Sequence, residues 1–272
     1  MFDFRFGNVD EVRHNTEEFV IFVKHLLPRW LNGITDQQCL ALLASVRSSS
    51  STGGVLIETG CGASTIPLVV DAILNDRQVF SWDISGHKGS QLRLVLSEAI
   101  GLALEVDVND YWTFIAADSL DPLVGIGIIK EMGLAATFGF FDSQHTLDQL
   151  RAEVELAVSV SSTNLVIALD DAYYRSIAHN YAYRNLQRLK LGLPSVIEPS
   201  ENIGPEFRDA IFKILSESFA EVKDLGGVYI ADPEDVHLRY FSQDRKVFGG
   251  AGMEARDRLQ DRFSAWSCSR PS

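Results

Sequence analysis

Short apolar runs alternate with amphipathic segments along the middle of the chain. Each run has the length and the β-branched or aromatic residues of a buried strand. The predicted strands are Val55–Glu58, Gln78–Asp83, Tyr111–Ala116, Ala135–Phe141 and Asn164–Leu169, and the predicted helices between them are Ile66–Leu74, Lys88–Ala99, Leu120–Met132 and Leu147–Val160. The second of these helices is expected to close near Gly101. Strands that alternate with helices predict an α/β domain built on a mostly parallel sheet.

Both ends of the chain carry further predicted elements. Before the first strand, Val12–Leu27 has apolar residues at helical spacing, and Asp36–Val46 is predicted as a helix with Asp36 as its N-cap. The elements predicted after the fifth strand are the helix Ala172–Lys190, the lid-like loop Leu193–Glu206, the strands Phe219–Lys223 and Gly227–Ala231, and the helix Met253–Trp266. The predicted units are an N-terminal helical cap (1–50), a central domain (51–240) and a C-terminal helical extension (241–272).

The stretch Val55–Thr65 (VLIETGCGAST) joins the first predicted strand to the next helix through two glycines. A backbone that approaches a ligand closely carries no Cβ, and glycine also tolerates positive φ. The loop over Gly60 and Gly62 is therefore predicted to hold a ligand at the carboxyl edge of the sheet, where open α/β sheets bind them.

A glutamate, Glu58, precedes the first of these glycines by two residues. A dinucleotide-binding loop has a third glycine where this chain has Thr65, and a carboxylate in this place repels phosphate. The same carboxylate suits a ligand with an ammonium and a sulfonium group, a description that fits S-adenosylmethionine (SAM). About 20 residues on, Asp83 stands where a nucleotide fold places an acid for ribose hydroxyls.

Three aspartates follow the fourth and fifth predicted strands. Asp142 ends the fourth, and Asp170 and Asp171 end the fifth. Like charges gathered at one sheet edge are costly without a compensating cation, and a set of carboxylate oxygens suits Mg²⁺, or Ca²⁺ or Mn²⁺, better than zinc. The alternative is that Asp170 caps the following helix and Asp171 faces water.

The run E-T-G-C-G-A-S-T resembles the first motif of class I SAM-dependent methyltransferases. D-S-Q-H followed by L-D-D is similar to metal-dependent small-molecule O-methyltransferases, including those that methylate antibiotic sugars. These commonly show I-D-G-D-H, so Ser143 and Gln144 depart from their pattern. The likeness covers roughly residues 54–174 and implies a Rossmann-like fold of seven strands, the last one antiparallel, flanked by helices.

The resemblance also implies roles for residues. His145 corresponds to the general base, next to the metal ligand Asp142, and the run containing Asp118 and Ser119 corresponds to the segment that reads adenine. The predicted cofactor site comprises Glu58, Gly60, Cys61, Gly62, Ser64, Thr65, Asp83, Asp118 and Ser119. The predicted metal ligands are Asp142, Asp170 and Asp171, and the predicted catalytic residues are His145 and Asp142.

Composition narrows the partners. The formal net charge of −13 argues against a nucleic-acid or anionic-membrane surface, and only three cysteines occur in 272 residues, too few for a disulfide framework. No apolar run approaches the thickness of a bilayer, and the first residues lack a signal-peptide pattern, so we expect a soluble, cytoplasmic protein. Whether it forms a homo-oligomer stays open.

The sequence therefore predicts a SAM- and Mg²⁺-dependent O-methyltransferase that acts on a hydroxyl of a small natural product or sugar. Three alternatives remain. The same fold and acids serve other chemistry, such as hydroxylation or aminopropyl transfer; the chain is an NAD-dependent oxidoreductase; or it is a non-enzymatic module that binds SAM.

Overall fold

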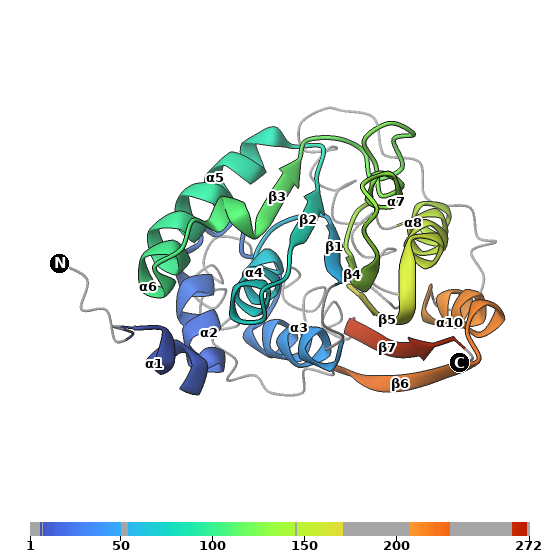
Figure 1. The fold of residues 1–272 in the computed structure, drawn as a ribbon, viewed down its shortest axis with the longest axis horizontal. Coiled ribbons are helices and arrows are strands. Elements are labelled where there is room, and N and C mark those ends of the chain that lie inside the picture. Colours follow the sequence, from blue (N-terminus) through green and yellow to red (C-terminus); the bar gives the residue numbers. More distant parts are fainter. Residues whose placement is uncertain are drawn as a thin grey trace, which may run out of the picture.

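A seven-stranded sheet with the order β3-β2-β1-β4-β5-β7-β6 organises the protein (Figure 1). The computed structural model describes residues 6, 8–49, 54–144, 146–170, 207–228 and 263–270. The strands are β1 (Val55–Thr59), β2 (Val79–Trp82), β3 (Trp112–Ile115), β4 (Ala136–Phe141), β5 (Ser161–Leu169), β6 (Glu221–Val228) and β7 (Phe263–Ser269). The first five strands pair in parallel, and β7 pairs antiparallel with both β5 and β6. The predicted seven strands with an antiparallel last strand are confirmed.

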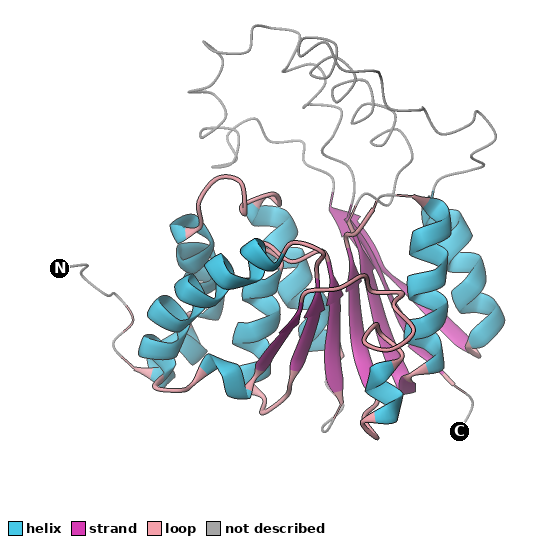
Figure 2. Cartoon of the chain, turned by 90° about the horizontal axis from the view of Figure 1, so that it is seen from above, coloured by secondary structure: helices cyan, strands magenta, loops and turns pink. Residues whose placement is uncertain are grey.

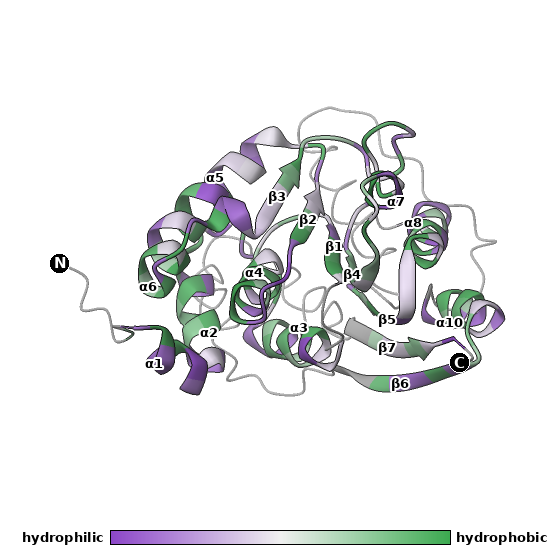
Figure 3. Ribbon diagram, in the orientation of Figure 1, coloured by the Kyte–Doolittle hydropathy of each residue, from purple (hydrophilic) through white to green (hydrophobic). Residues whose placement is uncertain are grey.

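Helices cover both faces of this sheet (Figure 2). One face packs against α2 (Thr16–Leu26), α3 (Asp36–Ser48), α4 (Thr65–Leu74) and α5 (Gly86–Leu96), and the other against α7 (Ile128–Glu131), α8 (Leu147–Ser159) and α10 (Phe207–Ser218). A separate apolar core lies on each face. Helices such as α8 carry both hydrophobic and hydrophilic residues (Figure 3), as expected where one side of a helix is buried.

The N-terminal helices differ from their predicted limits. The expected helix Val12–Leu27 is two helices, α1 (Val9–His14) and α2, because the chain breaks at Asn15. The helix expected from Asp36 does begin there, but its N-cap is Thr35. The hydroxyl of Thr35 accepts from the backbone of Gln38, and the side chain of Gln38 accepts from the backbone of Thr35. This capping box, and not Asp36, caps the start of the helix.

Two segments in the middle of the chain were also predicted incorrectly. The helix α5 does not close near Gly101 but continues through a π-helical turn (Ser97–Gly101) into α6 (Leu102–Leu104), and Glu105 ends it in the left-handed conformation. In the range expected to be helical after β3, only α7 is an α-helix. The preceding residues form turns in which Asp118 and Asp121 accept hydrogen bonds from the backbone.

The C-terminal elements required the largest correction. Phe219–Lys223 and Gly227–Ala231 were predicted as two strands, but within the described residues one strand, β6, runs from Glu221 to Val228; residues 229–231 lie outside them. Its partner is β7, whose residues 263–266 were predicted as the end of the helix Met253–Trp266; residues 253–262 of that predicted helix lie outside the described residues. Trp266 is fully buried between β5 and β6, because its strand completes the sheet. The predicted helix Ala172–Lys190 and loop Leu193–Glu206 lie outside the described residues.

Candidate functional site

The turn after β1 brings its backbone against the end of β4. Gly60 has φ of +80°, a conformation that favours glycine, and a Cβ there would collide with the carbonyl oxygen of Asp142. The turn is braced from outside by the α2–α3 loop, where the carbonyl of Leu31 accepts from the backbone of Ala63 at 2.9 Å. Glycine at position 60 therefore permits a close contact between two strand ends of the sheet.

Glu58 lies beneath this turn and not on its outer side. Its carboxylate is fully buried and accepts hydrogen bonds from Ser64 Oγ at 2.7 Å, Thr65 Oγ1 at 2.9 Å and Ser81 Oγ at 2.6 Å. Thr65 Oγ1 also accepts from the backbone of Gly62 at 3.2 Å, which extends the network into the turn. Burial raises the pKa of Glu58 to about 7, although these three hydrogen bonds lower it.

This arrangement corrects the expectation that Glu58 faces a positively charged ligand. The pocket beside the turn is lined by neither Glu58 nor the hydroxyl residues that bind it, Ser64 and Thr65. The side chain of Cys61 is likewise buried; it lies 3.7 Å from an Asp83 oxygen, and burial raises the pKa of its thiol. These residues shape the turn from inside, and other residues line the pocket.

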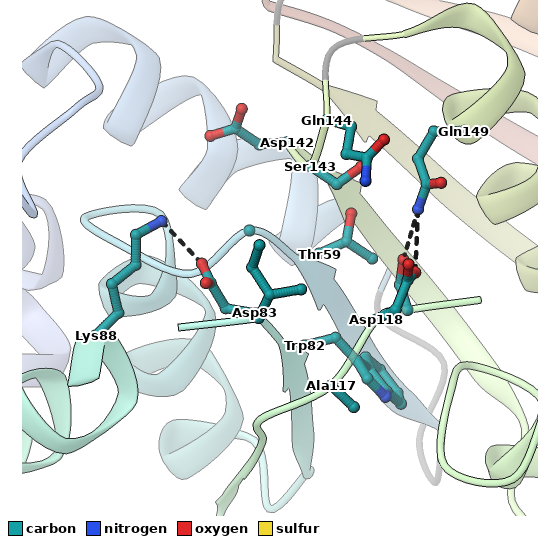
Figure 4. Close-up of a pocket in the computed structure, with 13 residues that line it drawn as sticks. Thr59, Trp82, Asp83, Lys88, Ala117, Asp118, Asp142, Ser143, Gln144 and Gln149 are labelled. Carbon is teal, nitrogen blue, oxygen red and sulfur yellow. Dashed lines mark hydrogen bonds and ion pairs between the residues drawn. The ribbon is translucent and has the colours of Figure 1, made fainter. Parts of the chain in front are cut away.

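The pocket lies at the carboxyl ends of four parallel strands (Figure 4). Its lining comprises residues 59–60 at the end of β1, 82–84 at the end of β2, 117–119 after β3 and 142–144 after β4, together with Lys88 from α5 and Gln149 from α8. Four of the residues predicted to bind the cofactor line it: Gly60, Asp83, Asp118 and Ser119. This is the sheet edge where open α/β folds bind ligands.

Asp83 and Lys88 point toward each other on one side of the pocket (Figure 4). Lys88 Nζ lies 2.8 Å from Asp83 Oδ2, and the backbone of Ser85 donates to Asp83 Oδ1 at 2.8 Å. Burial alone lowers the pKa of Lys88, but the hydrogen bond and the charge of Asp83, with a further contribution from Asp142, raise it above its usual value. Asp83 Oδ2 accepts from both Lys88 and Cys61, whereas Oδ1 accepts only from Ser85 among these groups and retains a lone pair for a ligand.

A second buried carboxylate, Glu153 of α8, organises the opposite side of the pocket. It accepts hydrogen bonds from the hydroxyl of Ser119, from Ser143 Oγ at 2.9 Å and from Gln149 Nε2 at 3.2 Å. The side chain is fully buried, and burial raises its pKa, although the hydrogen bonds from Ser119, Ser143 and Gln149 lower it. These donors come from the loops after β3 and β4 and from α8 itself.

The predicted metal ligands are described in part. Asp142 and Asp170 follow adjacent strands, and the backbone of Asp170 donates to the carbonyl of Phe141 at 3.1 Å, so the two residues begin at neighbouring points of one edge. Gln38 Nε2 lies 3.4 Å from Asp170 Oδ1. Asp171 and His145 lie outside the described residues. Across the part of the chain that is described, no group of three His, Cys, Asp or Glu side chains is arranged to hold a metal ion.

The sequence interpretation missed Lys88, Gln149 and Glu153. One signal for Glu153 was available: it lies three residues after Leu150 and four before Ala157, on the apolar side of α8, where a glutamate is expensive unless it is paired. Trp82, at the end of β2, is buried and borders the pocket, and its Nε1 donates to the carbonyl of Val124 at 2.7 Å.

No helix in the described ranges has both the length and the apolar character that a membrane span requires. No protein-family model matches the chain, and no curated protein matches it in sequence.

Solved structures do match. An O-methyltransferase from Bacillus cereus in complex with SAH is 14% identical, with a TM-score of 0.53 over 94% of this chain and 91% of that one. An O-methyltransferase of tomaymycin synthesis from Streptomyces achromogenes, in complex with SAM, is 14% identical, with a TM-score of 0.52 over 100% of both chains. A geranyl diphosphate methyltransferase in complex with SAM is 12% identical, with a TM-score of 0.51 over 86% and 85% of the two chains. The sheet order, the antiparallel β7 and these similarities together show that this chain has the Rossmann-like fold of class I SAM-dependent methyltransferases.

Proposed function

We propose that the protein is a SAM-dependent O-methyltransferase that acts on a hydroxyl of a small molecule with the help of Mg²⁺. The observation that carries the proposal is a single pocket bounded by the positive-φ glycine Gly60 and by the acid Asp83. In a nucleotide-binding α/β fold, the turn after β1 and the acid after β2 hold successive parts of one ligand. The SAM- and SAH-bound structures of the same fold support the choice of ligand.

The residues of the pocket fit SAM. Its ribose hydroxyls are donors, and Asp83 Oδ1, which accepts from the backbone of Ser85, retains a lone pair for them. The turn at Gly60 brings peptide groups, without a side chain, to the pocket edge. When bound, SAM supplies the methyl group from its sulfonium. The chain's own task is then to hold the acceptor in line with that group and to exclude water, since alignment accounts for much of the rate of such transfers.

Oxygen ligands of the type that Mg²⁺ prefers stand at the ends of β4 and β5. Asp142 and Asp170 are the described members of the set, and the hydrogen bond from Gln38 orients Asp170 as an outer-shell partner does. We propose that Asp171 completes the set and that His145 receives the proton of the acceptor hydroxyl. A bound Mg²⁺ would lower the pKa of that hydroxyl.

The fold also bears on the alternatives. A dinucleotide-binding sheet has the order 3-2-1-4-5-6, whereas this sheet places an antiparallel strand between β5 and β6. That difference favours SAM over NAD. The similarity to a geranyl diphosphate methyltransferase means that the fold alone does not identify the methyl acceptor. The hydroxyl acceptor proposed here therefore rests on the acids at the ends of β4 and β5.

Calorimetric titration with S-adenosylhomocysteine (SAH) and, separately, with NADH tests the proposal. We expect saturable binding of SAH and none of NADH, with the SAH affinity little changed by EDTA because the metal set lies on the acceptor side. Binding of NADH alone, or of neither ligand, would contradict the proposed function. Incubation with methyl-labelled SAM and a panel of small hydroxylated acceptors, with and without EDTA, then tests methyl transfer and its need for metal.

A further inference from the structure

Four polar side chains form one side of the pocket above the buried Glu153, and we call them the Glu153 wall: Asp118, Ser119, Ser143 and Gln149. Asp118 and Ser119 follow β3, Ser143 follows β4, and Gln149 belongs to the first turns of α8. Gln149 and Asp118 point toward each other at the right of Figure 4. The wall thus joins three separate elements through one carboxylate.

The three side chains that hydrogen-bond to Glu153 can all donate, and an ionised carboxylate accepts hydrogen bonds and donates none, so Glu153 in its ionised form fixes where the hydrogens of the wall point. The hydroxyl hydrogens of Ser119 and Ser143 are directed to its two oxygens. The amide nitrogen of Gln149 lies 3.2 Å from Glu153 Oε1 and 3.4 Å from Asp118 Oδ1. An amide oxygen in that place would face two carboxylates, so the nitrogen assignment is chemically required.

The donor hydrogens of the wall are therefore all used in hydrogen bonds to Glu153 and within the wall. Ser119 and Ser143 retain only lone pairs, because each hydroxyl has a single hydrogen, and one lone pair of Ser119 already accepts from Gln149 Nε2 at 3.2 Å. Asp118 is an acceptor with two occupied sites, filled by the backbone of Leu120 at 2.9 Å and by Gln149, and it is exposed beside the pocket. A ligand group that meets this wall must supply hydrogens.

The position of the wall identifies the part of the ligand that meets it. Under the proposed function, the turn after β1 and Asp83 after β2 hold the first parts of SAM. The next strand along the same edge is β3, and its loop carries Asp118 and Ser119. The base of the nucleoside, which lies beyond the ribose, is the group that reaches this loop.

We propose that Glu153 is a specificity-determining positioning residue, which makes the base-facing wall of the pocket accept hydrogen bonds and so selects a purine with an exocyclic amine over one with an exocyclic oxygen. This inference rests on the proposed function. An adenine amino group supplies two hydrogens to the wall. The exocyclic oxygen of a 6-oxo purine is instead an acceptor and would face the lone pairs of the wall. Polar groups of the wall and of the ligand would then be left without hydrogen-bond partners.

Titration of the whole protein with SAH and with S-inosylhomocysteine, its 6-oxo counterpart, tests the proposal. We expect the wild type to bind SAH more tightly by about tenfold or more. Glu153→Gln places amide hydrogens against Ser119 or Ser143, and the displaced hydroxyl hydrogen then turns toward the ligand. The preference should shrink to about threefold or less, chiefly because the 6-oxo ligand binds better than before. Glu155→Gln, at an exposed position of the same helix, should leave the preference unchanged.

The outcomes separate the two proposals. If the wild type does not bind SAH, the proposed function fails and this inference with it; if it binds both ligands equally, only the inference fails. Equal weakening of both ligands by Glu153→Gln would mean that Glu153 is structural, and would overturn the inference. If Glu153→Gln does not fold, Ser119→Ala serves instead, because it removes one oriented lone pair. An unchanged preference in Ser119→Ala would also overturn the inference.

Discussion

Ser81 Oγ donates to Glu58 Oε2 at 2.6 Å, a bond between β2 and β1 directly beneath the glycine turn. Ser81 accepts in turn from Trp112 Nε1 at 2.9 Å, so its own hydrogen is left for the carboxylate. The chain Trp112–Ser81–Glu58 crosses three neighbouring strands inside the sheet. It gives the turn a rigid base, and it makes the stability of the fold sensitive to the charge on one glutamate.

We expect the stability of the protein to depend on pH through Glu58. Its pKa is raised from 4.5 in the unfolded chain to about 7 in the folded one, so the folded state holds the proton more tightly. The stabilisation is present below pH 4.5 and is lost as the pH rises through 7, by about 3 kcal/mol in all. Glu58→Gln removes this dependence. Urea unfolding at pH 5 and pH 8 should therefore show Glu58→Gln gaining stability relative to the wild type at the higher pH. A difference that does not change with pH would contradict the assignment.

Gly60→Ala should disrupt the site. The left-handed conformation costs alanine about 1–2 kcal/mol, and the added methyl group also meets the carbonyl of Asp142, so we expect a loss of at least about 2 kcal/mol of stability and of most SAH binding. Gly127→Ala is the matched control, because a Cβ there meets nothing within 4 Å and its φ is negative. Denaturant unfolding and SAH titration of both variants provide the measurement. Equal behaviour of the two alanines would refute the close approach of the turn to β4.

Asp83→Ala should weaken SAH binding by about 10- to 100-fold, the effect of losing a charged acceptor for a ligand hydroxyl. The fold should persist, since Asp83 borders the pocket and its main partner, Lys88, is partly exposed. Asp110→Ala, an exposed aspartate near β3, is the control. Calorimetry gives the affinities and a thermal melt confirms folding. An affinity like that of the wild type would remove Asp83 from the cofactor site.

Metal binding has a readout that needs no acceptor. Mn²⁺ binds the oxygen ligands that suit Mg²⁺, and its spin resonance signal reports the free ion. We expect the double variant Asp142→Asn and Asp170→Asn to weaken Mn²⁺ binding by at least about tenfold, given that even outer-shell losses have such effects. Asp209→Asn, an exposed position on α10, should not change it. Unaltered Mn²⁺ binding in the double variant would exclude these two aspartates as ligands.

The sequence predicted the five parallel strands, because apolar runs buried on both faces have few alternative structures. The glycine turn was recognisable from the sequence because Gly60 has a positive φ, a conformation that favours glycine. The strand β7 was missed, since Phe263–Ser269 lies far along the chain from its partners and its first four residues overlap the predicted helix Met253–Trp266. Pairing over such distances leaves no local signal.

The site was predicted less completely than the fold. The sequence shows where acids occur but not which way their side chains point. Glu58 and Asp83 were both assigned to the ligand, and only Asp83 lines the pocket. Whether a carboxylate faces inward depends on the hydroxyls that surround it, and Ser64, Thr65 and Ser81 come from two different elements. Glu153 was overlooked because its donors lie on three elements that meet only in the folded protein.

The order of strands has a consequence for how the chain is made. β7 separates β5 from β6, so residues 221–228 are translated before their hydrogen-bonding neighbour, residues 263–269. Until then, β5 and β6 each present an open edge, the kind of surface on which newly made chains associate wrongly. Loss of β7 from the folded protein would recreate that exposure while leaving the strands around the pocket in place.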